Sequence, residues 1–430
     1  MLRCIAPLIT ALMLLPAVNV SAYQLRMTPD SRVLIWDNLS LMMEIDTSAV
    51  PKLEGAQAAI EGAFEEWVGW GVPMSVSNVS VAGPSTVARD NSNRIFWETQ
   101  NWEYGADVVA MTISVYNPNS AIVNETDIVF NGVNFKWTTD PTKTTGAFDV
   151  QNVVTHEVGH LFGLGHASGQ PDATMFASTP AGEVTKRALS TDDRSGVSAL
   201  VEEMEVRLNM NLEDFDPDSI QPSPRAGCSV GGESGGDFAL MLGLLFGLFL
   251  VRRRSAIFSL AIVLLYGGAA NATVVRAVSM DQLVANAPVV FEGKVLRSDP
   301  RLERGLVFTY HQVEVSRCHR GACSNNLVTV RTLGGEVGDV GVKVEGMPVL
   351  KKGEQVLLFG RSIAAAKSIQ ILGFSQGLFR VEKGMAVRDT KGLMLVNSPT
   401  VRETHQHKHE GSIVRIPVDQ LRQRIAKIKR

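Results

Sequence analysis

Three histidines and one glutamate stand close together between residues 156 and 166. His156 and His160 are four residues apart, so on a helix they share one face and can bind one metal ion, while Glu157 projects beside that ion. Gly163 can end the helix because glycine accepts a positive φ, and the returning chain can then bring His166 to the same ion. Three imidazoles leave the remaining zinc positions for water and substrate, which is the arrangement of catalytic zinc.

These residue types predict metal-assisted hydrolysis. Zinc lowers the pKa of a bound water towards about 7 and polarises a carbonyl group. Glu157 can accept the proton of that water during attack on a peptide carbonyl and deliver it to the leaving amine. We therefore expect a zinc-dependent peptide-bond hydrolase with Glu157 as the catalytic base and His156, His160 and His166 as the ligands of one zinc ion.

A helix has to carry the first two histidines. Apolar residues recur at helical spacing through this segment and Asp149 can act as an N-cap, so we expect a helix over residues 150–162. A second helix is predicted over residues 51–70, with Pro51 at its first position. Period-two alternation predicts strands over four short segments, 41–45, 74–81, 94–98 and 108–116.

The histidine segment matches H-E-x-x-H-x-x-G-x-x-H at every fixed position, and Met175 follows within Asp-Ala-Thr-Met-Phe. Together these motifs resemble the metzincins, in which a methionine turn lies beneath the zinc. Residues 127–138 and 189–200 resemble two elements of the matrixin family, the strand before the active-site helix and the start of the last helix. The resemblance covers about residues 25–205. It implies an α+β fold, with a twisted five-stranded sheet, an active-site helix and a cleft for an extended protein or peptide substrate.

The resemblance also implies roles for the strand segments. Residues 108–113 would be the edge strand whose free backbone pairs with the substrate; the alternative is a strand that only contributes to the core. The family usually has a histidine for a structural zinc where this chain has Val129, so a second zinc is not expected. Asp127 and Asn131 are the candidates for the calcium ligands that the family places nearby. This domain lacks a cysteine, so latency through a propeptide thiol would need another device.

The net charge of −3 is the sum of two opposed halves. Residues 23–225 carry 28 acidic and 12 basic side chains, a balance of −16, whereas residues 273–430 carry 14 acidic and 25 basic ones, a balance of +11. An acidic first half would repel nucleic acid and favour neutral or basic polypeptides. A length of 430 residues predicts two or more domains. We expect the catalytic domain to be monomeric and no nucleic-acid partner.

Apolar segments predict export. Residues 1–22 have the basic, apolar and small-residue parts of a secretory signal peptide, with a cut after Ala22. The run 238–251 follows Cys228 and precedes three arginines, which resembles the myxobacterial MYXO-CTERM sorting signal over residues 226–254; Cys228 would then be the processing and anchoring position. The alternative is a plain membrane anchor. Both readings predict a transmembrane helix at the cell surface.

A second signal-like segment follows the arginines. Residues 256–266 are apolar and Ala272 ends a small-residue cleavage pattern. We expect two neighbouring exported proteins joined in one chain, by a true fusion or by a lost stop codon, which either stays whole or is processed into two products. The sequence predicts six parts: a signal peptide (1–22), a matrixin-like metalloprotease domain (23–205), an acidic linker (206–225), a sorting segment (226–254), a second signal-like segment (255–272) and a β-rich domain (273–430).

The second half reads as an all-β domain, a small barrel or sandwich. Its glycine-rich stretch 334–341 is expected to be a loop. Cys318 and Cys323 favour a local disulfide, which an exporting compartment permits; a zinc site that includes the intervening His319 is the alternative. The histidines between 405 and 409 favour a solvated tail over a metal site, and the basic run 422–430 could touch an anionic surface.

Taken together, the sequence predicts an exported zinc endopeptidase, anchored or released after processing and followed by a second exported β domain. The competing hypothesis is a surface-anchored binding or structural protein whose basic β domain carries the main role.

Overall fold

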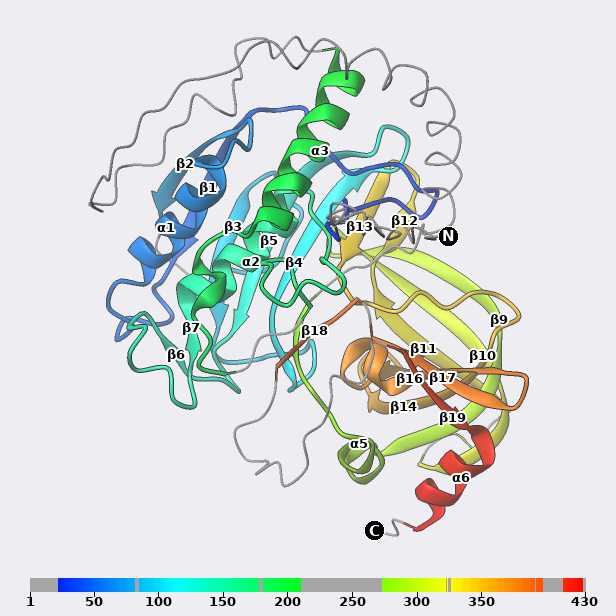
Figure 1. The fold of residues 1–430 in the computed structure, drawn as a ribbon. Helices are drawn as coiled ribbons and strands as arrows, with labels where there is room; N and C mark the ends of the chain where they lie inside the picture. The colour runs from blue at the N-terminus through cyan, green and yellow to red at the C-terminus, as the bar shows by residue number, and fades with distance from the viewer. Residues whose placement is uncertain are drawn as a thin grey trace, which may run out of the picture.

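The computed structural model describes residues 22–81, 85–177, 181–209, 273–321, 323, 326–390, 392–396 and 413–427 (Figure 1). The predicted linker and sorting segment beyond residue 209, Cys228, the second signal-like segment and the histidines between 405 and 409 lie outside these ranges. None of the helices in these ranges combines the length and the hydropathy that a membrane span requires. The membrane segments expected at 238–251 and 256–272 fall outside the described residues.

Three helices belong to the first half: α1 (Ala56–Val68), α2 (Val150–Phe162) and α3 (Thr191–Leu208). Helix α2 confirms the prediction, because the Asp149 side chain accepts a hydrogen bond from the Asn152 amide at its start and Gly163 adopts a φ of 119° at its end. The predicted start of α1 at Pro51 is wrong. Residues 51–55 form turns, and Gly55 has a φ of 74° that a helix cannot include, so the helix begins one residue later.

Five strands of the first half form a sheet with the order β4-β5-β3-β1-β2. Their bounds are β1 Ser40–Asp46, β2 Ser75–Ser80, β3 Asn93–Glu98, β4 Val108–Asn117 and β5 Ile122–Asn131. All neighbours are parallel except β4 and β5, which are antiparallel. A short pair, β6 (Trp137–Thr138) and β7 (Phe148–Asp149), leads into α2, and the 3₁₀ turn η1 (Thr185–Arg187) precedes α3. The five-stranded sheet and active-site helix confirm the expected α+β class.

The two faces of this sheet are buried against different partners. Side chains alternate along β3, so Ile95 and Trp97 share a core with α1 and α2, while Phe96 points to the opposite face. That opposite face forms one core with residues of the second half, among them Val307 and Phe374. The two halves therefore share a hydrophobic core, although the sequence predicts two separate domains.

The second half is mainly β structure, as predicted, with two short helices added. Its elements are β8 (Val274–Arg276), α5 (Met280–Asn286), β9 (Val289–Glu303), β10 (Leu306–Arg320), β11 (Leu327–Leu333), β12 (Gly335–Val337), β13 (Val340–Val344), β14 (Gln355–Ile363), β15 (Ser368–Ile371), η2 (Phe374–Gly377), β16 (Leu378–Glu382), β17 (Met385–Asp389), β18 (Met394–Val396), β19 (Ile413–Pro417) and α6 (Val418–Lys427).

Strand pairing closes a barrel in this half. The order is β15-β11-β10-β9-β14-β16-β17-β19, and β15 also pairs with β14. Strands β9, β10, β11, β15 and β14 therefore form a closed ring. Helices α5 and α6 cover one side, with Leu283 and Leu421 in a common core. A disulfide joins Cys318 to Cys323, whose Cα atoms are 5.5 Å apart.

The prediction of a loop at residues 334–341 is wrong. This stretch contains β12 and the start of β13, which pair antiparallel as a hairpin, and β13 pairs antiparallel with β4 of the first half. The alternation of Val340, Val342 and Val344 explains the strand, because all three side chains are buried. Figure 1 shows the hairpin in yellow beside the cyan strands of the first half.

Candidate active site

Helix α2 and the turn after it bring the three predicted histidines together. Their ring nitrogens form a group within 4.8 Å of one another, and all three side chains are fully buried. The Nε2 atom of His156 lies 3.1 Å from that of His160 and 2.9 Å from that of His166. A tetrahedral zinc with Zn–N bonds of about 2.0–2.1 Å separates its ligand nitrogens by about 3.3 Å, so this donor set fits one zinc ion.

Backbone carbonyls orient two of the rings. The Nδ1 atom of His156 lies 2.7 Å from the Thr174 carbonyl oxygen, and that of His160 lies 2.8 Å from the Leu164 carbonyl oxygen. A carbonyl only accepts, so each Nδ1 carries the proton and each Nε2 keeps a lone pair for a metal. Burial lowers the pKa of both histidines, that of His160 to about 4, which keeps the rings neutral as ligands must be.

Met175 lies directly beneath this helix. A Cβ atom on Gly159 would lie 2.4 Å from the Met175 sulfur and 2.6 Å from the Trp67 ring, so only glycine fits at that position of the motif. Asp193 of α3 fixes the turn, because its carboxylate accepts hydrogen bonds from the amides of Thr174 at 2.7 Å and Met175 at 2.9 Å. The same turn supplies the carbonyl that orients His156.

Glu157 belongs to α2, and its side chain contacts β4. Its Oε2 atom accepts a hydrogen bond from the Thr112 hydroxyl at 2.5 Å, and the side chain is fully buried. Burial raises the pKa of Glu157 to about 8, although hydrogen bonds from Thr112 and from the backbone at Val274 act in the opposite direction.

Residues of the second half complete the surroundings of the site. Glu345, which follows β13, forms a buried ion pair with Arg26, with Nε and Oε1 2.5 Å apart. Arg26 also donates hydrogen bonds to the His160 carbonyl and to Ser114. Sequence reasoning missed Arg26, Thr112 and Glu345. Only Thr112 carried a signal, since it lies in the strand that the family resemblance placed beside the site.

The free edge expected at residues 108–113 is also a wrong prediction. Strand β8 pairs antiparallel with Val108 and Ala110, and β13 pairs with residues 113–116. Because both faces of the sheet are covered, every residue of β4 except Asn117 is buried. The strand is at the edge of the first half, but the second half continues the sheet beyond it.

The candidate calcium ligands are occupied by other bonds. The Asp127 carboxylate accepts hydrogen bonds from the amides of Ala88 and Arg94, and the side-chain Oδ1 of Asn131 accepts from the amides of Val133 and Asn134. Within the described residues, the three histidines form the one cluster of histidine, cysteine or carboxylate ligands that could hold a metal.

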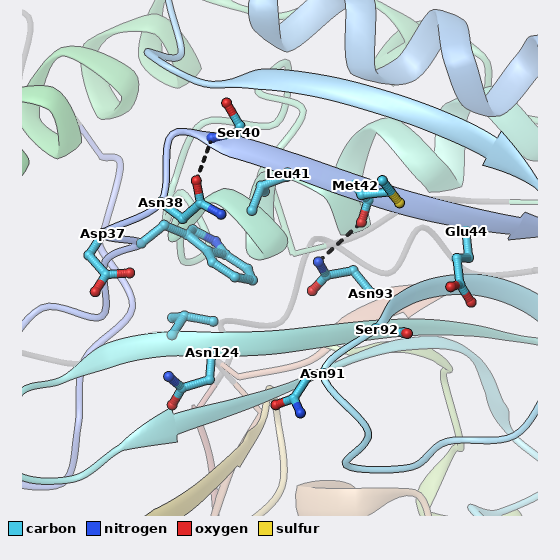
Figure 2. Close-up of a pocket in the computed structure, with 12 residues that line it drawn as sticks. Asp37, Asn38, Ser40, Leu41, Met42, Glu44, Asn91, Ser92, Asn93 and Asn124 are labelled. Atoms are coloured by element: carbon cyan, nitrogen blue, oxygen red, sulfur yellow. Dashed lines mark hydrogen bonds between the residues drawn. The ribbon is translucent and has the colours of Figure 1, made fainter.

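A separate polar cavity of about 280 Å³ lies at the start of β1 and β5 (Figure 2). Asp37, Asn38, Glu44, Asn93 and Asn124 line it, and the Asn93 amide donates to the Met42 carbonyl. None of the histidines lines this cavity, so it is distinct from the candidate active site.

The mixed sheet and the helix that presents three convergent imidazoles above a buried methionine form a site that fits one zinc ion. Residues 36–202 match the family model described as matrixin, and this part of the chain is matrixin-like. Metalloendoproteinase 1 of Glycine max is 44% identical over 63 residues, which are 14% of this chain and 20% of that protein. Metalloendoproteinase 5-MMP of Arabidopsis thaliana is 43% identical over 56 residues, which are 13% of this chain and 15% of that protein. The chain thus matches a fifth or less of the length of these relatives.

Proposed function

We propose that the first half is a zinc-dependent endopeptidase. His156, His160 and His166 hold one zinc ion, and Glu157 is the catalytic base. The observation that carries this proposal is the convergence of three buried Nε2 atoms at one end of the helix that also carries the buried Glu157. The similarity to matrixin and to two metalloendoproteinases supports it. The hydrogen bonds of Asp127 and Asn131 do not support a calcium ion beside β5.

The residues of the chain perform the proton transfers. When bound, zinc would supply Lewis-acid chemistry, acidifying a water and polarising the scissile carbonyl. The Glu157 carboxylate takes the proton of the attacking water and returns it to the leaving amine. Thr112 holds Oε2 of that carboxylate, so its other oxygen is the one oriented for the proton. Asp193 and Met175 fix the floor of the site and thereby the position of His156.

Glu157→Gln tests this assignment, because glutamine keeps the shape of the side chain but cannot take the proton. We expect the purified variant to bind one zinc per chain, as the parent chain does, and to lose hydrolysis of casein and of a quenched fluorescent peptide. A variant that cleaves the peptide at a measurable rate equal to that of the parent chain would remove Glu157 from the reaction.

We further propose that the protein is exported and anchored at the cell surface through the segment around Cys228. The Cys318–Cys323 disulfide supports an oxidising compartment for the second half. Intact-mass measurement of secreted and membrane fractions tests the expected cuts near Ala22, Cys228 and Ala272 together. A chain of full mass in both fractions contradicts the proposed processing.

The alternative is a surface-anchored binding protein in which the β-rich half has the main role. The extensive core that this half shares with the sheet is the observation in its favour. If cells that carry the Glu157→Gln variant keep the phenotype of cells with the parent protein, that result would support the alternative.

A further inference from the structure

The backbone of β4 is already paired along most of its length. Val108 and Ala110 face β8, and Ile113, Ser114, Val115 and Tyr116 face β13, both in antiparallel register. An extended peptide that adds to a sheet edge uses these same N–H and C=O groups. Two segments of the second half therefore stand where a peptide aligned along β4 would lie.

The first of these segments passes the catalytic carboxylate. Val274, in β8, reaches Glu157 through its backbone, and Thr273 beside it is fully buried. The Thr273 hydroxyl donates to the Glu345 carbonyl, and the Thr273 carbonyl accepts from the Met394 amide of β18 at 2.9 Å. The segment is therefore held on both sides beside the proposed base, and Glu157 has no exposed surface.

Buried charges anchor the second segment. The Arg26–Glu345 ion pair joins the amino-terminal segment to the end of β13, and neither side chain has more than 1% of its surface exposed. Arg26 also bonds to the His160 carbonyl at 2.7 Å, and Lys343 donates to the Met27 carbonyl at 2.7 Å. Removing one partner of such a pair leaves an uncompensated buried charge, so loss of the Glu345 charge would destabilise the docked arrangement.

Close packing completes the fit. A Cβ atom on Gly341 would lie 2.4 Å from the Tyr116 ring across the β13–β4 pair, and the Tyr116 hydroxyl donates to Glu336 at 2.7 Å. On the neighbouring face, Val342 and Val344 belong to the same apolar core as Met111 and Ile113 of β4. The second half is therefore complementary to the edge of β4 in backbone pairing, in charge and in shape.

We propose that the second half is a built-in inhibitor of the peptidase site, with β8 and β13 occupying the edge of β4 that an extended peptide substrate needs. The proposal rests on the proposed peptidase function. Cleavage of a polypeptide then requires the β8 and β13 segments to leave β4, whether or not the chain has been cut between its halves.

Two substitutions in the full-length chain test the docking. Gly341→Ala places a methyl group against the Tyr116 ring, and Glu345→Gln removes the charge that neutralises Arg26. Gly338→Asn is the matched control in the same hairpin, because a side chain there meets nothing within 4 Å and asparagine tolerates its positive φ. Glu354→Gln is the charge control, since its ion pair with Arg380 lies within the second half.

Amide hydrogen exchange of residues 108–117 measures the docking of β8 and β13 on β4 independently of activity. Hydrolysis of a quenched fluorescent peptide measures the access of a substrate to the active site. In Gly341→Ala and Glu345→Gln we expect exchange and hydrolysis at least about tenfold faster than in the parent chain, a change of about 1.4 kcal/mol in the docking equilibrium. Both controls should stay within about twofold of the parent. Protection of β14 should persist in every variant, which shows that the barrel remains folded.

Rapid exchange of residues 108–117 in the parent chain, or unchanged exchange and hydrolysis in both interface variants, would overturn the inhibitor proposal. Loss of β4 protection without any hydrolysis would contradict the proposed peptidase function. It would overturn the inhibitor proposal as well, because the docked segments would then have no activity to inhibit. Faster exchange together with faster hydrolysis supports both proposals.

Discussion

Asp193 offers a sharp test of how α3 positions the zinc ligands. Its carboxylate is fully buried and accepts hydrogen bonds from three backbone amides, those of Thr174 at 2.7 Å, Met175 at 2.9 Å and Ser190 at 2.8 Å. Asp193→Asn keeps one acceptor oxygen but turns an NH₂ group towards at least one of these donors. A hydrogen bond to a charged group contributes about 1.5–3 kcal/mol, so we expect a loss of about 3 kcal/mol in the free energy of unfolding.

The assay is thermal unfolding with zinc present, compared with Glu202→Gln, an exposed position on the same helix. A loss of about 3 kcal/mol corresponds to a fall of about 6–12 °C in Tm for a unit of this size. Zinc affinity should fall as well, because the turn held by Asp193 supplies the carbonyl that orients His156. A Tm and a zinc affinity equal to those of Glu202→Gln would refute the link between α3 and the metal site.

Two further predictions concern other buried contacts. Burial alone would raise the pKa of Glu292, but hydrogen bonds from Arg422 and His319 outweigh it and lower the pKa to about 2, so this stabilisation is complete above about pH 4.5 and disappears as the pH falls towards 2. The difference in unfolding free energy between the parent chain and Arg422→Gln, expected to be about 2–3 kcal/mol at neutral pH, should therefore shrink over that range; a constant difference in chemical denaturation would contradict it. Thr112→Val removes the hydrogen bond to Glu157, whereas Thr112→Ser retains this bond. We therefore expect kcat/KM for the peptide to fall about tenfold in Thr112→Val and to stay near the parent value in Thr112→Ser. Equal rates for both variants would exclude this positioning role.

Local features of the site could be predicted from the sequence. The spacing of His156 and His160 fixes their common face once a helix forms, and the Asp149 cap and Gly163 stop act within a few residues of that helix. Met175 follows soon after, so a recognisable motif covers it. Each of these predictions depends on contacts between residues near one another in the chain.

The contacts that close the site could not be predicted in this way. Arg26 and Glu345 are 319 positions apart, and either would pass for an ordinary surface charge in the sequence. The glycines between 334 and 341 favoured a loop, because a glycine-rich stretch has weak strand propensity. Gly341 is instead required where β13 approaches the Tyr116 ring, a demand that only the folded partner strand imposes.

The same non-local reason explains the error at residues 108–113. The alternation of the strand was readable, but whether its outer edge is free depends on which distant segment pairs with it. Thr112 was likewise assigned to a strand without its bond to Glu157, since that bond needs α2 to pack across the sheet.

Hydrolysis in ¹⁸O-labelled water tests whether Glu157 activates water for cleavage of a peptide bond. The full-length chain carrying Gly341→Ala is incubated with zinc and a peptide, and the products are weighed by mass spectrometry. We expect new carboxyl termini that carry one ¹⁸O atom, and none when Glu157→Gln is added to the same chain. Uncut peptide with the zinc bound, or labelled products that persist after Glu157→Gln, would contradict it.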